Sequence, residues 1–212
     1  MSRSAFVRAA ALATAFALSG CVSVLPAPSV PKALIALPAD RAEAPAAPLR
    51  ADIAVFTPDA TRAFSGTDLA VSSGQEMVYL ADVRWADAAP VLLQEAVING
   101  LSRAEGDGRA VPAQLGARVD YDLRWRIVDL SVSRQSGPVH AIVEASLVDS
   151  RTRRIVAQNR FEAMGEPDGR SSRERAAALA VVAQQVADKV AAFVAETAEP
   201  HDAAASGGRR NR

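Results

Sequence analysis

The sequence is poor in cysteine, histidine and aromatic residues. It has one cysteine, Cys21, and two histidines, so it offers neither an internal disulfide nor a Cys/His zinc site of the usual spacing. Aromatic residues make up 5% of the 212 residues and hydrophobic residues make up 50%. A core is therefore possible, but it must be built from alanine, valine and leucine.

An excess of charge of either sign is also missing. The formal net charge is zero, and loss of residues 1–20 would remove Arg3 and Arg8 and leave 22 basic against 24 acidic residues. A nucleic-acid-binding face and a polybasic membrane-binding surface both need clustered positive charge. The balance of charge argues against nucleic acid as a partner and against a basic membrane surface.

The motifs of common catalytic sites are absent too. No serine stands in a Gly-x-Ser-x-Gly elbow, and the pair Gly106 and Gly108 lacks the lysine and the helix of a phosphate-binding loop. Asp120 and Asp122 share one face of an expected strand. Pairing with neighbouring arginines is a simpler interpretation of them than acid–base catalysis, so we do not expect an enzyme.

The first 20 residues have the three zones of a bacterial signal peptide. Arg3 and Arg8 form a positive n-region, and residues 9–17 form an uncharged apolar run. This run is too short for a helix that spans a bilayer, which needs roughly 20 residues. The ending Leu-Ser-Gly-Cys, residues 18–21, resembles the lipobox of bacterial lipoproteins.

The lipobox resemblance implies a diacylglyceryl group on the sulfur of Cys21 and cleavage between Gly20 and Cys21. Each buried methylene contributes about 0.8 kcal/mol to membrane binding, so two or three acyl chains would anchor the protein durably. Apart from this covalent lipid we expect no cofactor and no metal. An ordinary secretory signal with an incidental cysteine is the alternative.

The residue after the cysteine bears on the membrane in which the anchor lies. It is Val22 and not aspartate, which in enterobacteria favours sorting to the outer membrane, although the rule varies between lineages. The Ala- and Arg-rich composition is typical of a GC-rich proteobacterium, which has such a membrane. We therefore expect the inner leaflet of the outer membrane, facing the periplasm, and leave the inner membrane open.

Composition divides the rest of the chain into three parts. Residues 21–50 contain six prolines and have the character of an extended tether, with a first strand at 33–37 as an option. Residues 51–197 form the expected domain. Residues 198–212 are small and polar, include His201, and are expected to be a disordered tail.

Two segments have the periodicity of helices. Apolar residues recur every four positions from Leu93 to Leu101 and predict a helix over 88–103, with Asp87 as its cap and Pro90 in its first turn. A second helix, expected to run to about residue 196, has capping-box spacing at its start and one apolar face. Its marker residues are Ser171, Glu174, Leu179, Val182, Val186, Val190 and Phe193.

The clearest strand signal covers residues 119–133, where apolar and charged side chains alternate, as in a strand buried on one face. The alternation slips at 127–128, which indicates a β-bulge. Segments 139–148 and 154–163, separated by a polar turn at 149–153, predict two further strands. The three strands together would form an antiparallel meander.

Shorter strands are expected at 53–57 and 76–85, with a turn at 73–74 and a break near Asp82. The sum is a single α+β domain, in which two helices cover one face of a mostly antiparallel sheet. Trp125 falls in phase with the apolar face of its strand, and Trp85 stands just before the helix start, where it could pack against the helix as a staple. We therefore expect both to be structural and not to bind a ligand. His140 begins a strand on the solvent face.

The order of these elements resembles the ABC-type transport auxiliary lipoprotein family over roughly residues 21–197. A lipobox and a proline-rich tether come first, followed by the helix entry Trp-Ala-Asp-Ala-Ala-Pro at 85–90 and the strand Tyr-Asp-Leu-Arg at 121–124. The first strand departs from the family, which often has Tyr-x-Leu where this chain has Ala-Leu-Ile at 33–35. The family-motif residues, all expected to be structural, are Trp85, Asp87, Pro90, Tyr121 and Leu123.

This resemblance implies a non-catalytic subunit of a lipid transport system. Such systems have a permease, a cytoplasmic ATPase and a periplasmic substrate-binding protein of the mammalian-cell-entry (MCE) type, which the lipoprotein would dock at the outer membrane. An exposed sheet edge would also permit a homo-oligomer. Two alternatives stay open: a lipid- or ligand-binding lipoprotein that acts alone, and an envelope assembly factor.

Overall fold

The computed structural model describes residues 30–134 and 137–201; Gly20 and Cys21 lie outside them. The compact unit begins at Pro31, so the fold starts earlier than the expected boundary at residue 51. The elements in chain order are β1 (Ala33–Ile35), the 3-10 turn η1 (Ala39–Arg41), β2 (Ile53–Val55), β3 (Asp59–Ala60), β4 (Asp68–Ser73), β5 (Glu76–Trp85), α2 (Ala89–Leu101), β6 (Ala110–Pro112), the 3-10 turn η2 (Ala113–Leu115), β7 (Tyr121–Ser133), β8 (Val139–Asp149), β9 (Ile155–Gly165) and α3 (Ser172–Thr197).

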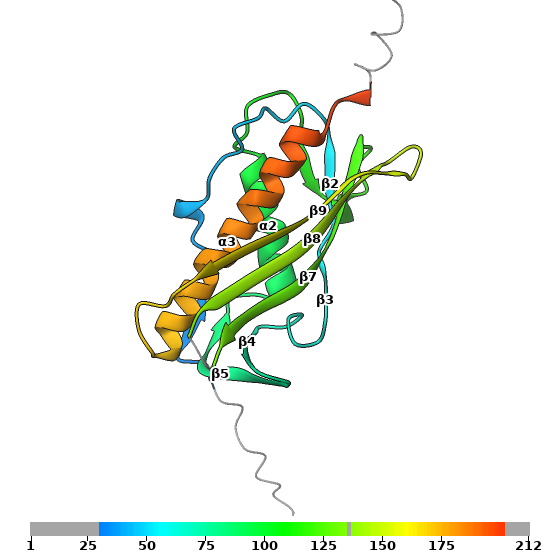
Figure 1. Ribbon diagram of the computed structural model, residues 1–212. Helices are drawn as coiled ribbons and strands as arrows, with labels where there is room; N and C mark the ends of the chain where they lie inside the picture. Colours follow the sequence, from blue (N-terminus) through cyan, green and yellow to red (C-terminus); the bar gives the residue numbers. More distant parts are fainter. Residues whose placement is uncertain (1–29, 135–136, 202–212) are drawn as a thin grey trace, which may run out of the picture. The chain divides into compact units, whose positions relative to one another are not determined.

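One sheet of nine strands is organised around β7. On one side β7 pairs antiparallel with β8, and β8 pairs antiparallel with β9. On the other side β2, β3 and β4 each pair parallel with a different stretch of β7. Both helices lie on the same face of this sheet (Figure 1). The α+β fold with two helices on one face is therefore confirmed, although the sheet is mixed: its longest ladders are antiparallel and its short ones parallel.

The predicted meander is formed by β7, β8 and β9. The register of β7 against β8 shifts between Ile127 and Asp129, which confirms the bulge. The shift restores the apolar phase, because Leu130 and Val132 are buried beyond it, as Leu123 and Trp125 are before it. A strand of thirteen residues with one continuous apolar face, about 40 Å long, can support both helices.

Small side chains let α3 lie deep against the sheet and against α2. Alanine and valine supply most of its buried positions. A Cβ atom at Gly100 of α2 would lie 3.2 Å from the Cβ of Ala191 in α3, so the two helices are in close contact there. By length and composition α3 could cross a bilayer, yet 56% of its most apolar 18-residue window is buried within the protein.

Both helices begin where the sequence predicts. Ser171 and Glu174 form the complete capping box of α3, in which each side chain accepts from the other residue's backbone N–H. Pro90 lies in the first turn of α2. Asp87 does not cap the helix itself; its carboxylate accepts from the N–H of Ala88, the residue at the cap position.

The β4–β5 hairpin confirms the turn expected at residues 73–74, and its first strand, β4, is one whose bounds the sequence pattern did not predict. Gly74, with φ of 64°, makes the turn, and Asp82 has φ of 65°, which explains the interruption expected near it in β5. The hairpin pairing also shifts register between Asp68 and Ala70. As a result Val83 and Trp85, beyond the break, point into the core while Met77 and Tyr79 remain exposed.

The proline-rich segment before residue 51 is partly built into the domain. β1 pairs parallel with β5, so the optional first strand exists, although it is shorter than 33–37. Farther on, Leu49 is 1% exposed and its backbone bonds to Glu105 and Gly108. Any Cβ at Gly106 (φ 113°) or Gly108 would collide with the backbone of residues 49–51, so these two glycines allow the close approach.

The first residues of the expected C-terminal tail are ordered against the sheet, which corrects the prediction for 198–201. Ala198 is 2% exposed, and the carbonyl of Glu199 accepts a hydrogen bond from the Tyr121 hydroxyl at 2.8 Å. His201 lies between two carboxylates, so it is not a solvated tail residue. Residues 202–212 lie outside the described chain.

The capping box gives a direct test of how α3 is fixed. We expect Ser171→Ala to lower the free energy of unfolding by about 1 kcal/mol, because the N–H of Glu174 loses its acceptor. Urea unfolding followed by circular dichroism measures this change. Ser172→Ala, one position inside the helix, is the control and should change stability far less; equal effects of the two substitutions would contradict the capping role.

Candidate functional site

The sequence-predicted site residues do not form one cluster. Gly20 and Cys21 lie outside the described residues. Trp85 is 2% exposed at the end of β5, close in the chain to Pro90, which is buried at the start of α2. Both residues thus flank the entry into α2.

The second motif group lies at the start of β7. Leu123 is fully buried, and Tyr121 is 9% exposed. Farther along β7, the indole of Trp125 is 5% exposed and donates to the carbonyl of Phe56 at 2.6 Å, so Trp125 is a core residue with its polar atom satisfied. In the described chain, the two motif groups do not line a common pocket.

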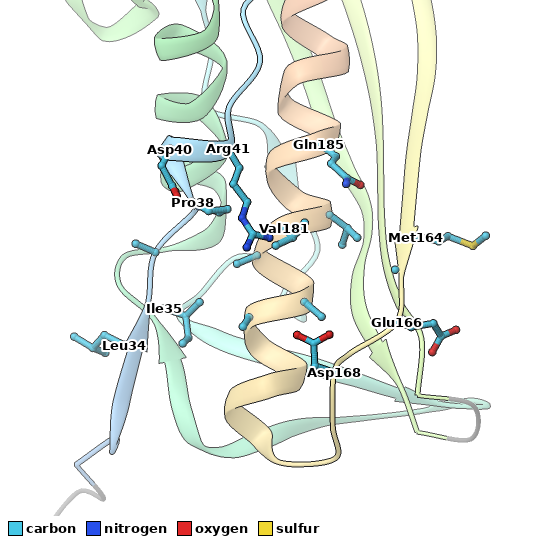
Figure 2. A pocket seen from close by; sticks show the side chains of 16 residues that line it. Leu34, Ile35, Pro38, Asp40, Arg41, Met164, Glu166, Asp168, Val181 and Gln185 are labelled. Carbon is cyan, nitrogen blue, oxygen red and sulfur yellow. The ribbon is translucent and has the colours of Figure 1, made fainter.

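The exposed side of α3 forms the floor of an open groove, shown in Figure 2. Its lower part is a hollow of about 560 Å³ between β1 and the end of β9, over the first turns of α3. Ala177, Ala178 and Val181 line it from α3. Leu34 of β1 and Met164 of β9, 61% and 68% exposed, stand on its two sides. Both bordering strands are edges of the sheet, so their outer sides have no further strand within the described chain.

A second hollow of about 600 Å³ continues the groove toward the end of α3 and shares Arg41, Val181 and Gln185 with the first. Figure 2 shows the Arg41 side chain reaching from η1 toward Val181. Acidic residues outnumber basic ones along both hollows. The acidic lining residues are Asp40, Glu43, Glu166, Asp168, Asp188 and Glu196, and the basic ones are Arg41 and Lys189.

Asp188 is the least exposed of these carboxylates. Burial raises its pKa above the ordinary value, and the negative charge of Glu43 adds to the effect, while hydrogen bonds from the Gln184 side chain and the Glu43 backbone oppose it. The bond from Gln184 is 2.9 Å long. Lys189, the nearest cation in the chain, donates instead to the carbonyl of Glu162 on the edge of β9. The positive charge of Arg103 lowers the pKa of Asp188 only as the smallest of these contributions, so the groove keeps an excess of negative charge.

The C-terminal strap, residues 198–201, makes a second polar cluster at the other end of the sheet. The Nδ1 of His201 lies 3.2 Å from Asp120 and its Nε2 lies 2.9 Å from Asp149, with the imidazole edge-on to the Tyr121 ring at 5.1 Å between centroids. Arg50 lies 3.6 Å from Glu199. No local pattern in the sequence points to this cluster, since its members come from distant segments.

The charged residues weighed as possible acid–base groups have ordinary structural partners. Asp122 pairs with Arg153 at 2.7 Å and with Arg124 at 3.7 Å, as the simpler interpretation predicted. Asp120 instead pairs with His201 and accepts from the N–H of Asp52. Among the described residues no group of three or more His, Cys, Asp or Glu side chains could hold a metal ion.

The apolar space between the helices and the sheet is filled. The hollow bordered by Leu37, Trp85 and Leu93 has no room for a water molecule. The larger hollows are the open groove on α3 and a polar basin of about 890 Å³ beside His201. The geometry therefore offers surfaces for contact with another molecule more readily than an enclosed lipid chamber.

A family model described as the ABC-type transport auxiliary lipoprotein component matches residues 34–191. The chain belongs to this family. The resemblance inferred from the motif order is thereby confirmed. The match extends from β1 to α3, so it includes both bordering strands of the groove and most of its floor.

Two solved structures show the same fold. Protein XCC0632 from Xanthomonas campestris, a DUF330 protein, is 19% identical with a TM-score of 0.70, covering 80% of this chain and 96% of that one. An uncharacterized protein is 14% identical with a TM-score of 0.59, covering 77% of this chain and 99% of that one. No curated protein matches the chain.

The raised pKa of Asp188 predicts the sign of a stability change. We expect Asp188→Asn to raise the free energy of unfolding at pH 7 by up to about 1 kcal/mol, because it removes a partly desolvated charge and keeps the oxygen that accepts from Gln184. The gain should shrink as the pH falls through the raised folded-state pKa, where the carboxyl becomes neutral in the folded protein, and should be lost below the lower unfolded-state pKa, where it is neutral in both states.

Urea unfolding at pH 7 and near pH 4 measures both the gain and its loss on acidification. Asp40→Asn, on the exposed rim of the same groove, is the control and should leave stability nearly unchanged. A destabilised Asp188→Asn variant at pH 7 would show that the charge of Asp188 is compensated in the folded protein.

Proposed function

We propose that the protein is a non-catalytic auxiliary subunit of an ABC-type lipid transport system, and that it holds the periplasmic MCE-type component of that system at the outer membrane. The family match over residues 34–191 is the observation on which the proposal rests. ATP hydrolysis and movement of the lipid would then belong to other subunits. This chain would contribute position and a docking surface.

The anchor in this proposal is the lipid on Cys21, whose position follows from the lipobox. Eleven residues separate Cys21 from Ala33 at the start of β1, and the chain from one to the other spans at most about 40 Å when extended. The domain would thus be held within about one domain length of the membrane surface. Its partner would have to approach to a comparable distance.

The groove on α3 is the surface that we propose for the partner. The floor of its lower hollow is mostly apolar and made of small side chains, and the groove is lined mainly by acidic residues among its charged groups. A segment of the periplasmic component that carries lysine or arginine beside apolar residues would bury the floor and neutralise the rims. Within the described chain, no ion pair involves Asp40, Glu43, Asp168 or Glu196, so those carboxylates remain available to such a segment.

The anchor is tested by Cys21→Ser. We expect this variant to keep the fold, since Cys21 precedes the compact unit, but to leave the membrane fraction and to fail to support lipid transport. Fractionation of the envelope on a density gradient, followed by mass spectrometry of the wild-type N-terminus, measures location and acylation. Wild-type transport by a soluble, unlipidated variant would contradict the proposed role of the anchor, and sedimentation of the wild type with the inner membrane would contradict the proposed location.

The docking surface is tested by Ala177→Arg, an exposed position on the floor of the groove. The added side chain would fill the lower hollow and reverse the local charge, so we expect recovery of the MCE-type component in a crosslinked pull-down to fall at least tenfold, which corresponds to about 1.4 kcal/mol. Asn99→Arg makes the same charge change at an exposed position of α2 outside the groove and should leave recovery unchanged.

Recovery with Ala177→Arg and Asn99→Arg tests the docking surface, and recovery with the wild-type protein tests the transport role itself. If neither variant alters recovery, the partner binds elsewhere on the domain. If the wild-type protein itself recovers no MCE-type component, the transport role is wrong. A lipid found with the wild-type protein beyond its own anchor, after gentle extraction, would favour the alternative of a lipid-binding lipoprotein that acts alone.

A further inference from the structure

The last side chain of the C-terminal strap, His201, makes the most closely paired contacts between the strap and the sheet. Its imidazole is 9% exposed and lies between the carboxylates of Asp120 and Asp149, at 3.2 Å and 2.9 Å. The strap also rests on Tyr121, whose hydroxyl donates to the carbonyl of Glu199. The buried Ala198, which caps the end of α3, and the ion pair of Arg50 with Glu199 at 3.6 Å also hold the strap in place.

The geometry of the two carboxylates distinguishes the protonation states of His201. Each ring nitrogen faces a carboxylate oxygen, but neutral imidazole has only one N–H, so its other nitrogen would set a lone pair against a negative charge. The buried Nε2 has no aligned hydrogen-bond partner in the described structure, so its contact with Asp149 depends on charge. The imidazolium ion is attracted to both oxygens, and neutral imidazole leaves a buried polar atom unsatisfied.

We infer that the C-terminal strap is a pH-dependent clasp, closed when His201 is protonated and released when it is neutral. Histidine is the side chain whose charge ordinarily changes between about pH 5 and pH 8. The clasp should therefore be tighter at acidic pH and looser at mildly alkaline pH. The inference rests on the geometry of the strap and is independent of the transport role.

Two of the groups that contact His201, Asp149 and Tyr121, keep a fixed charge over this range. Hydrogen bonds from the backbone and side chain of Thr152, together with the charge of His201, lower the pKa of Asp149, so Asp149 stays ionised. Burial raises the pKa of Tyr121, with a further contribution from Asp149 and Asp120, so its hydroxyl remains a donor. The remaining charged groups near the strap are Arg50 and Glu199, which face each other, and Arg118, Asp52, Asp122 and Arg151 in the adjoining basin.

Release of the clasp would change the surface at this end of the sheet. The strap covers the ring of Tyr121, which is 9% exposed while the strap is closed. It also borders the polar basin of about 890 Å³. With the strap open, that basin would gain an aromatic side chain at the start of β7, so a molecule binding there would encounter a different surface at each pH.

Hydroxyl-radical footprinting read by mass spectrometry measures this opening at Tyr121. The other tyrosine, Tyr79, is 47% exposed on β5 and serves as an internal reference at every pH. In the protein purified from the envelope in detergent, we expect the ratio of Tyr121 to Tyr79 labelling to rise about threefold or more between pH 5.5 and pH 8.0.

The two histidines of the sequence supply a matched pair of variants. His201→Gln cannot become charged, and its ratio should be high and independent of pH; His140→Gln, on the outer face of β8, should respond like the wild type. Circular dichroism confirms that each variant is folded. A wild-type ratio that does not change with pH, a His201→Gln variant that still responds, or a His140→Gln variant that does not respond would overturn the inference.

Discussion

The burial of α3 against the apolar face of the sheet is the interaction on which the structure depends. β7, β8 and β9 each turn alternate side chains toward the helices, and those side chains have no other cover. A helix of alanine and valine fits this surface closely, since short side chains bring its backbone near both the sheet and Gly100 of α2. The scarcity of aromatic residues is thus compatible with a well-filled core.

The same packing creates the surface that we assign to the partner. Because α3 is buried along most of its circumference, only a narrow stripe remains exposed. Two strands from opposite edges of the sheet, β1 and β9, come to stand on either side of that stripe. The groove therefore follows from how the sheet surrounds the helix, and its acidic rims come from η1, the residues after it, the loop after β9, and α3 itself.

The described chain also has two distinct ends. It enters through β1, which is fixed to β5, and it leaves through the strap, which is fixed to the start of β7. β7 itself separates these regions, since its last residues pair with β4 and its first residues contact the strap.

The sequence by itself determined the elements whose pattern is local and long. The period of apolar residues predicted both helices, the three long strands and the bulge, and the capping box fixed the start of α3. The proposal of a lipid anchor at Cys21 likewise rests on adjacent residues only. Strands of two or three residues such as β3 and β6 hold no full period, so only pairing with β7 or β2 defines them. The groove and the contacts of His201 join segments far apart in the chain, and only tertiary structure could bring them together.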